Sequence, residues 1–306
     1  MALIPEPADG TVKRIYESYE KREKQHFSRR LGASQIGRPC GREKWYSFRW
    51  AKAQHWEGRM LRLFLKGHLE EPIVGSDLKQ IGVDWQPVDP ETGEQWEFSE
   101  LGDHFVCKLD GAACGFVESP ATWHVVEIKT SSEQAFNKVC REGCAKAKPE
   151  HMAQMVTGMG LSGMERAMYI VVNKNTDEIY TERIHYNAKD WKRILQQAKE
   201  IIFAVEPPER INESPAHWQC KFCNFASICH DMGGIAEVNC RTCQFSTPLE
   251  EGGWVCEAHR TSISYEEQMA GCDDHVRRPG MVCATASKAL DMFNGKLTTP
   301  VEDCNV

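Results

Sequence analysis

Acidic and basic side chains recur at the ends of apolar segments in the first half of the chain. In VVEIKTSS, residues 125–132, Glu127 and Lys129 are two positions apart, so on a strand both project from the same face. Upstream, HFVCKLDG ends an apolar segment at Asp110. Two carboxylates at neighbouring strand ends make an oxygen-ligand site for Mg²⁺ or Mn²⁺. Each motif alone is also typical of an ordinary surface, since Glu-x-Lys is a common solvated pair and Asp-Gly a common hairpin turn.

Two predicted helical segments supply further polar side chains. LFLKGHLEEPIV places His68 and Glu71 one helical turn apart, on one face. Glu70 is the neighbouring candidate, and the register with His68 favours Glu71. PEHMAQMVTGM places Gln154 on the helix that follows the lysine strand. As isolated residues they are equally typical of a solvated helix surface.

The chain has 14 cysteines, and eight of them fall in residues 220–283. The N-terminal MALIPEPADG lacks the basic start and apolar stretch of a secretory signal, so metal ligands are expected rather than disulfides. WQCKFCNFASICH supplies Cys220, Cys223 and Cys229, one ligand short of a tetrahedral site. Cys40, in IGRPCGREKWYSFRW, is the candidate for the fourth.

A second group of candidate metal ligands follows the first: Cys240, Cys243, Cys256, His259, Cys272 and His275. The first four have zinc-ribbon spacing, with two short knuckles about a dozen residues apart. The fourth ligand is open between the last three, and buried free thiols are the alternative. Large aliphatic residues are sparse in 240–275, so this segment is expected to become ordered only with Zn²⁺. The other six cysteines are interpreted as ordinary thiols.

The elements that must position these residues change in period along the chain. Apolar spacing and turn residues predict helices at 11–31, 41–50, from 59 onward, 133–144, 150–161 and 188–204. Gly32 is expected to end the first of these, Ser34 to cap the next, and Pro72 to kink or restart the third near Glu71. Short β-rich segments predict a meander between 80 and 129 and a hairpin at 168–186. The order of these predicted helices and strands along the chain predicts an α/β (α+β) core.

Charge is distributed unevenly. The net charge is −7, but residues 1–66 carry +8 and the remainder −15. The basic segment is able to contact a phosphate backbone, although charge alone favours a solvated, mixed-charge helix face. The longest apolar runs are too short for a membrane-spanning helix, and 9 Trp, 12 Phe and 7 Tyr argue against general disorder.

Taken in order, these residues resemble the PD-(D/E)XK nucleases, and look most like the RecB-nuclease and phage-exonuclease branch, over roughly residues 30–230. The shared pattern is Gly-His-x-x-Glu on a helix, Asp at a strand end, Glu-x-Lys on the next strand and Gln on the next helix. The resemblance implies a central mixed sheet flanked by helices. This chain departs from the family pattern at position 158, where it has Gly and some relatives carry the Tyr of Gln-x-x-x-Tyr.

The resemblance also implies a role for each site residue. Asp110 and Glu127 would bind the catalytic metal, helped by the backbone carbonyl of Ile128. Lys129 would orient or deprotonate the attacking water, and Glu71 would hold a metal directly or through water. His68 and Gln154 would support the metal or the DNA.

The first cysteine group resembles that of iron–sulfur nucleases related to CRISPR-associated and AddB-type enzymes. In those proteins one cysteine before the nuclease core and three after it bind a 4Fe-4S cluster. The resemblance implies such a cluster here as a staple between the two ends of the core, held by Cys40, Cys220, Cys223 and Cys229. Zn²⁺ in the same four thiolates remains the alternative.

The sequence thus predicts a Mg²⁺- or Mn²⁺-dependent deoxyribonuclease, an exonuclease of phage or prophage recombination or repair. Residues 1–232 would form the nuclease domain and 233–306 a zinc-ribbon-like module and tail. The alternatives are a non-catalytic zinc or iron–sulfur module that binds DNA or protein, and a structure-specific endonuclease. Expected partners are DNA and a single-strand annealing or recombination protein, with no membrane and with an oligomer allowed. The expected location is the cytoplasm, that of the bacterial host if the protein is phage-encoded.

Overall fold

The computed structural model describes residues 10–23 and 27–281, which form helices and strands in a mixed order. The helices are α1 (Thr11–Glu20), α2 (Ala33–Ile36), α3 (Gly41–Phe48), α4 (Gly58–Gln80), α5 (Glu133–Glu142), α6 (Cys144–Ala147), α7 (Pro149–Ser162), α8 (Ala188–Phe203), α9 (Trp218–Lys221), α10 (Ala226–Cys229) and α11 (Tyr265–Ala270), with a 3-10 turn η1 (Cys240–Thr242). The strands are β1 (Leu31–Gly32), β2 (Asp84–Gln86), β3 (Glu97–Glu100), β4 (Phe105–Lys108), β5 (Gly111–Cys114), β6 (His124–Ser131), β7 (Arg166–Asn173), β8 (Ile179–His185), β9 (Ser246–Pro248), β10 (Trp254–Cys256) and β11 (Thr261–Ser262).

The strands form three sheets, and the largest is a five-stranded mixed sheet in the order β2-β5-β6-β7-β8. Its central pair, β6 and β7, is parallel, and its other pairs are antiparallel. Both central strands are buried on both faces along most of their length, as expected of strands covered from two sides. A second sheet has the order β1-β4-β3 and a third β11-β10-β9. The predicted α/β class, with a mixed sheet flanked by helices, is confirmed, as are the hairpin of β7 with β8 and helices α3, α7 and α8.

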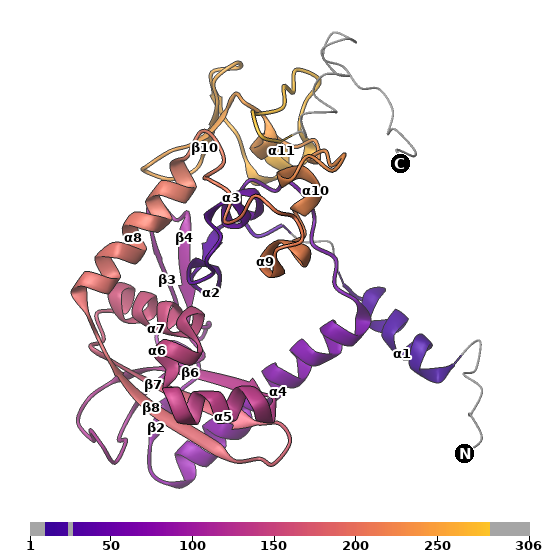
Figure 1. Cartoon of the computed structure of the whole chain (residues 1–306). Helices are drawn as coiled ribbons and strands as arrows, with labels where there is room; N and C mark the ends of the chain where they lie inside the picture. The colour runs from indigo at the N-terminus through magenta and orange to yellow at the C-terminus, as the bar shows by residue number, and fades with distance from the viewer. Residues whose placement is uncertain (1–9, 24–26, 282–306) are drawn as a thin grey trace, which may run out of the picture.

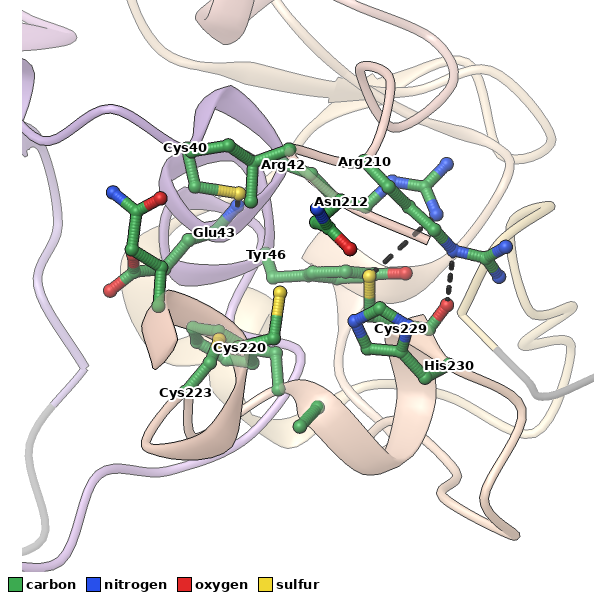
Figure 2. Close-up of a pocket in the computed structure, with 14 residues that line it drawn as sticks. Cys40, Arg42, Glu43, Tyr46, Arg210, Asn212, Cys220, Cys223, Cys229 and His230 are labelled. Carbon is green, nitrogen blue, oxygen red and sulfur yellow. Dashed lines mark hydrogen bonds between the residues drawn. The ribbon is translucent and has the colours of Figure 1, made fainter. Parts of the chain in front are cut away.

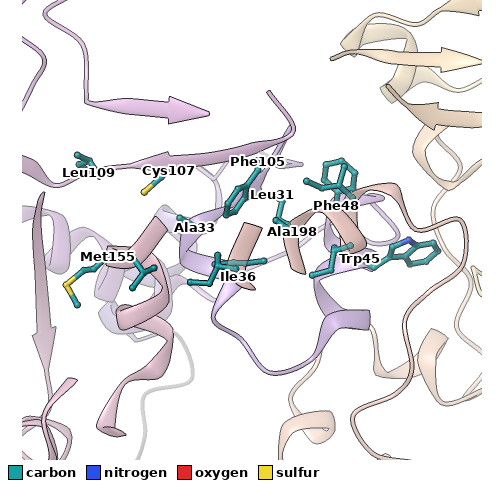
Figure 3. Packing of buried hydrophobic residues seen from close by; sticks show 14 of the residues in the cluster. Leu31, Ala33, Ile36, Trp45, Phe48, Phe105, Cys107, Leu109, Met155 and Ala198 are labelled. Carbon is teal, nitrogen blue, oxygen red and sulfur yellow. The ribbon is translucent and has the colours of Figure 1, made fainter. Parts of the chain in front are cut away.

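Two apolar clusters hold this arrangement together. The larger joins α2, α3, α7 and α8 to β4 and to one face of the five-stranded sheet (Figure 3). The smaller lies on the opposite face, where Val74 and Leu78 of α4 pack against Val126 and Ile128 of β6. Strand β6 therefore separates the two clusters, and the orientation of its side chains follows the alternation expected from the sequence.

Two predictions about the N-terminal helices are wrong, and a third is wrong in part. The first helix ends at Glu20 rather than continuing to residue 31, part of which range lies outside the described residues. Ser34 does not cap the next helix, because Gly32 occupies the N-cap and supplies no side chain. Helix α4 does not restart near Glu71, because Pro72 lies inside one continuous helix. The proline removes a single hydrogen bond on an exposed stretch of α4, and packing of Val74 onto the sheet carries the helix past it.

The C-terminal elements gather at one end of the molecule, beyond α3 and α8 (Figure 1). Three buried arginines that pair with no carboxylate in the described part of the chain fasten them to the core. The carbonyl oxygen of Ser246 accepts from Arg49 Nη1 at 3.1 Å and from Arg278 Nη2 at 2.7 Å. The guanidinium of Arg241 lies 3.9 Å above the ring of Trp50. No helix within the described ranges is long and apolar enough to cross a membrane.

Candidate active site and thiol clusters

Asp110 lies where the chain leaves one sheet for another. Strand β4 before it pairs with β1 and β3, whereas β5 after it pairs with β2 and β6, so the Asp-Gly pair does not close a hairpin. Asp110 Oδ2 accepts a hydrogen bond from the backbone N–H of Ile128 at 2.8 Å. This bond holds the carboxylate against β6, beside Glu127 and Lys129.

Three oxygen atoms of this region converge on one cation. The Lys129 Nζ lies 3.4 Å from Asp110 Oδ2 and 3.2 Å from the carbonyl oxygen of Ile128. It also forms an ion pair with Oε1 of Glu127, and that oxygen has no other partner among the described residues. The predicted grouping of Asp110, Glu127, Ile128 and Lys129 is therefore present in the geometry, with the ammonium at its centre.

Burial and charge together set the ionisation of this cluster. Glu127 is only 1% exposed, and burial raises its pKa to about 8, against the opposing effect of the neighbouring ammonium. Burial acts to lower the pKa of Lys129, but Glu127 and Asp110 outweigh it and raise that pKa above its ordinary value. The lysine therefore remains a cation, whereas Glu127 carries a proton below about pH 8.

Helix α4 brings Glu71 to the same place. Burial and the negative charge of Asp110 raise the pKa of Glu71, so the two carboxylates lie within one electrostatic environment. His68 Nδ1 lies 3.2 Å from Glu71 Oε1, on the outer side of the helix. Glu70 makes no hydrogen bond or ion pair with any residue that the structure describes. The geometry thus groups Glu71 and His68, as the helical register indicates.

A tryptophan fixes the position of α4 relative to Asp110. The ring of Trp85 packs on the backbone of Gly75 in α4 and of Gly111, the residue after Asp110. A Cβ atom would lie 2.0 Å from the Trp85 ring at Gly75, and 2.4 Å from its Nε1 at Gly111. Gly111 also has φ of +154°, which side chains disfavour. These two glycines let one indole ring bridge the helix that carries Glu71 and the chain that carries Asp110.

Helix α7 contributes a histidine that the sequence interpretation missed. His151 Nδ1 lies 2.6 Å from the hydroxyl of Tyr169, which is opposite Glu127 in the β6–β7 register. Burial, with the charge of Lys129, lowers the pKa of His151 to about 4, so its ring is neutral. Gln154, the residue predicted from this helix, makes no side-chain hydrogen bond among the described residues. The signal in the sequence was a second polar side chain one helical turn before Gln154.

The departure at position 158 has a structural reason. A Cβ at Gly158 would lie 2.9 Å from Cδ2 of Leu109 and 3.2 Å from Cγ1 of Val125. A tyrosine at this point of α7 would collide with β4 and β6. The absence of side-chain bulk at Gly158 allows the helix to pack directly on the strands that carry the site.

The first thiol group lines one hollow between α3 and the segment of α9 and α10 (Figure 2). Burial and the charges of Cys40 and Cys229 raise the pKa of Cys220, and burial raises that of Cys223 to about 11. Arg42 Nη1 donates to Cys229 Sγ at 3.8 Å. Cys40, 180 residues from its nearest companion in sequence, is therefore brought to the other three thiols by the fold.

In the second group, burial and then the charges of Cys272, Cys243 and Cys256 raise the pKa of Cys240 to about 11.

The two imidazoles have partners elsewhere. His259 Nε2 lies 3.0 Å from Oδ2 of Asp274, and His275 Nε2 lies 3.0 Å from Oγ1 of Thr242. Among the described residues no three His, Cys, Asp or Glu side chains are close enough together to hold a metal as they stand. Cys283 and Cys304 lie outside the described residues.

Comparison with known proteins gives weak likenesses. No family model matches the chain, and no curated protein matches it in sequence. Among solved structures, SSO0001 is 18% identical with a TM-score of 0.41, covering 71% of this chain and 93% of that one. The alkaline exonuclease LHK-Exo from Laribacter hongkongensis is 16% identical with a TM-score of 0.43, covering 60% and 90%. Its complex with dAMP is 14% identical with a TM-score of 0.40, covering 61% and 89%. Values this low do not assign a function, so the function must follow from this chain's own residues.

Proposed function

We propose that the protein hydrolyses phosphodiester bonds of DNA with Mg²⁺ or Mn²⁺ held by Asp110, Glu127 and the carbonyl oxygen of Ile128. One observation supports this above all others: these three oxygens already surround a single cation, the Lys129 ammonium. Carboxylate and carbonyl oxygens are the ligands that both metals prefer. The donor set therefore suits the ion, although only two of its members are acidic side chains.

Such a bound ion would supply Lewis acidity and neutralise charge that develops on the phosphate. The residues of the chain perform the remaining tasks. Lys129 places its ammonium beside the reacting phosphate, where it stabilises negative charge and holds a proton next to the attacking water. Glu71 extends the acidic set from α4, and His68 orients the Glu71 carboxylate. The neutral His151 orders the layer behind Glu127 through Tyr169.

We further propose exonucleolytic action in phage or prophage recombination, with a single-strand annealing or recombination protein as partner. The support is the ordered motif, Gly-His-x-x-Glu, Asp, Glu-x-Lys and Gln, which resembles that of phage exonucleases. A structure-specific endonuclease uses the same chemistry at an internal bond. An end-labelled substrate separates the two, because an exonuclease releases mononucleotides from the first time point onward.

For the thiols we propose two further metal sites. The first group would hold a 4Fe-4S cluster or, in its place, Zn²⁺. The second would hold Zn²⁺ through Cys240, Cys243, Cys256 and Cys272, since both imidazoles are engaged elsewhere. Metal analysis of the purified protein distinguishes the two possibilities for the first thiol group. Iron and a brown colour would identify a 4Fe-4S cluster. Two zinc ions per chain and no iron would instead indicate Zn²⁺ at that site.

The test of the proposed function is incubation of the full chain with end-labelled single- and double-stranded DNA, with Mg²⁺, with Mn²⁺ or with no added metal. Wild type is expected to degrade DNA only with metal. The Asp110→Asn variant is expected to lose activity by about 10²- to 10³-fold while remaining folded. Asp84→Asn, a change at an exposed aspartate on β2, is the matched control. DNA binding without hydrolysis by wild type would instead identify a non-catalytic binding module.

A further inference from the structure

Two adjoining hollows lie on the face of β4, at the contact between the core and the C-terminal elements. Their volumes are about 380 and 420 Å³, and both are lined by Arg29, Arg30 and Tyr265. The first extends to Arg241 and Trp254, and the second extends along β4 to Val106 and Lys108. Because they share three residues, they form one continuous groove, which we call the β4 groove.

The β4 groove is basic. Four cationic side chains line it, Arg29, Arg30, Lys108 and Arg241, against one acidic side chain, Asp103. Arg30 is neutralised by Glu97 and Asp103, and Lys108 shares Glu97. Arg29 pairs with no carboxylate in the part of the chain that the structure describes.

The groove also carries an aromatic platform. The guanidinium of Arg29 lies 3.7 Å above the ring of Tyr265, and that ring makes an edge-to-face contact with Trp50. Tyr265 begins α11, in the C-terminal part of the chain, and Arg29 precedes β1. A cation without a carboxylate partner, placed on an aromatic ring, offers charge to a phosphate and a flat surface to a base.

The direction of β4 connects this groove to the candidate active site. Val106 and Lys108 alternate with the buried Cys107 and Leu109, so they face the groove side of the sheet. Asp110 follows Lys108 by two residues, at the bend where the chain passes from β4 to β5. The groove therefore ends two residues before the first proposed metal ligand.

We propose that the β4 groove binds single-stranded DNA and leads the strand to Asp110. This inference rests on the proposed function for the direction of the strand, but the binding itself can be tested without hydrolysis. Arg29 and Lys108 would contact successive phosphates, and Tyr265 would stack a base. Stacking on a side chain requires a base that is not paired inside a duplex, which is why the single strand is the favoured ligand.

Binding can be measured by fluorescence anisotropy with a labelled single-stranded 20-mer and its duplex. The full chain with Asp110→Asn serves as the cleavage-deficient background. Adding Arg29→Glu is expected to weaken binding of the single strand by about tenfold, and to reduce the slope of log Kd against log salt concentration by about 0.7 for each phosphate that is no longer neutralised. Arg29→Lys keeps the charge and is expected to recover most of the affinity and the salt dependence. Lys192→Glu, at an exposed cation on α8 outside the groove, is the control and is expected to change binding less than about twofold.

Activity on two substrates separates this inference from the proposed function. With Mn²⁺, Arg29→Glu in an otherwise wild-type chain is expected to cleave bis(p-nitrophenyl) phosphate at the wild-type rate, because that substrate reaches only the active site. Its kcat/KM on the 20-mer is expected to fall about tenfold. The proposal that the β4 groove binds single-stranded DNA would be overturned by either of two results. One is equal binding by the Arg29→Glu and Lys192→Glu proteins, and the other is tighter binding of the duplex than of the single strand. A wild-type protein that cleaves neither substrate would overturn the proposed function. The anisotropy measurements would then still decide whether the β4 groove binds single-stranded DNA.

Discussion

The carboxylate cluster and the first thiol group bury ionisable side chains in opposite ways. At the carboxylates, Lys129 supplies a cation from the same strand as Glu127, so part of the negative charge of the site is compensated without a metal. At the thiols, Cys220 and Cys223 have raised pKa values because they are buried and near other thiols. Neutral thiols pack without penalty, but four thiolates would repel one another unless a metal joined them.

The folded structure around the carboxylates is therefore expected to depend less on a bound metal than the structure around the thiols. Under the proposed function, the carboxylate cluster is expected to keep its shape without a metal, and a bound catalytic ion is expected to exchange freely. The thiol groups connect segments distant in sequence, so their metals are expected to hold those segments in place.

The largest effect is expected from the first thiol group. Cys220→Ser should eliminate its metal and destabilise the joint between α3 and the segment of α9 and α10. Structural zinc in small domains contributes on the order of 10 kcal/mol, and a loss approaching that value would unfold the joint. Metal content and limited proteolysis measure the outcome. Cys140→Ser, at an exposed thiol outside both groups, is the control and should match wild type; intact protection in both variants would refute a structural role.

The second effect concerns the pH dependence of folding without added divalent metal. Folding raises the pKa of Glu127 from 4.5 to about 8. A raised carboxyl pKa contributes stability that is fully present below pH 4.5 and is lost as the pH rises through 8. We expect a loss on the order of 3–5 kcal/mol across that window, which Glu127→Gln should abolish. Urea unfolding of both proteins from pH 5 to 9 measures it, and parallel curves would contradict the account.

The third effect separates two adjacent acids on α4. Glu71→Gln removes a carboxylate from the environment of Asp110 and should lower nuclease activity by about 10- to 100-fold. Glu70→Gln should leave activity unchanged, because Glu70 makes no hydrogen bond or ion pair with the cluster in the part of the chain that the structure describes. Steady-state hydrolysis with Mn²⁺ provides the comparison. Equal losses in the two variants would mean that this helix face contributes only its general negative charge.

The smallest effect comes from the packing that places α4. Gly75→Ala drives a Cβ into the Trp85 ring and should destabilise the protein by about 1–3 kcal/mol, with reduced activity. Gly67→Ala, on the same helix but with nothing within 4 Å of its Cβ, should stabilise it by about 0.5–1 kcal/mol. Thermal unfolding measures both. A Gly75→Ala protein as stable as the Gly67→Ala protein would show that Trp85 does not fix the helix.

Local periodicity was sufficient to predict part of the site. The two-residue period of a strand places Glu127 and Lys129 on one face, and the helical period groups His68 with Glu71. Both inferences depend only on neighbouring residues. The position of Asp110 could not be predicted in the same way, because β4 and β5 enter different sheets. That separation depends on the pairing of Leu31 with Phe105, a contact between distant segments.

The rest of the molecule depends on contacts that no local pattern contains. Arg49, Arg241 and Arg278 are buried without carboxylates, and backbone carbonyl oxygens from distant segments are among their acceptors. Sequence alone classifies such residues as surface cations. Helix α4 continues through Pro72 for a related reason, since packing of its C-terminal half onto β6 outweighs one missing hydrogen bond. Tertiary contacts also bring Arg29 onto Tyr265, which lies 236 positions away in the chain.

Direct measurement of Mn²⁺ binding tests the central claim most sharply. Electron paramagnetic resonance of the full chain titrated with Mn²⁺ counts bound ions independently of any substrate. The account predicts that wild type and Cys140→Ser bind Mn²⁺ at the cluster, and that Asp110→Asn loses this binding while keeping its thiol-bound metals. Wild type that binds no Mn²⁺, or Asp110→Asn that binds it as wild type does, would contradict the assignment of these oxygens as the catalytic metal site.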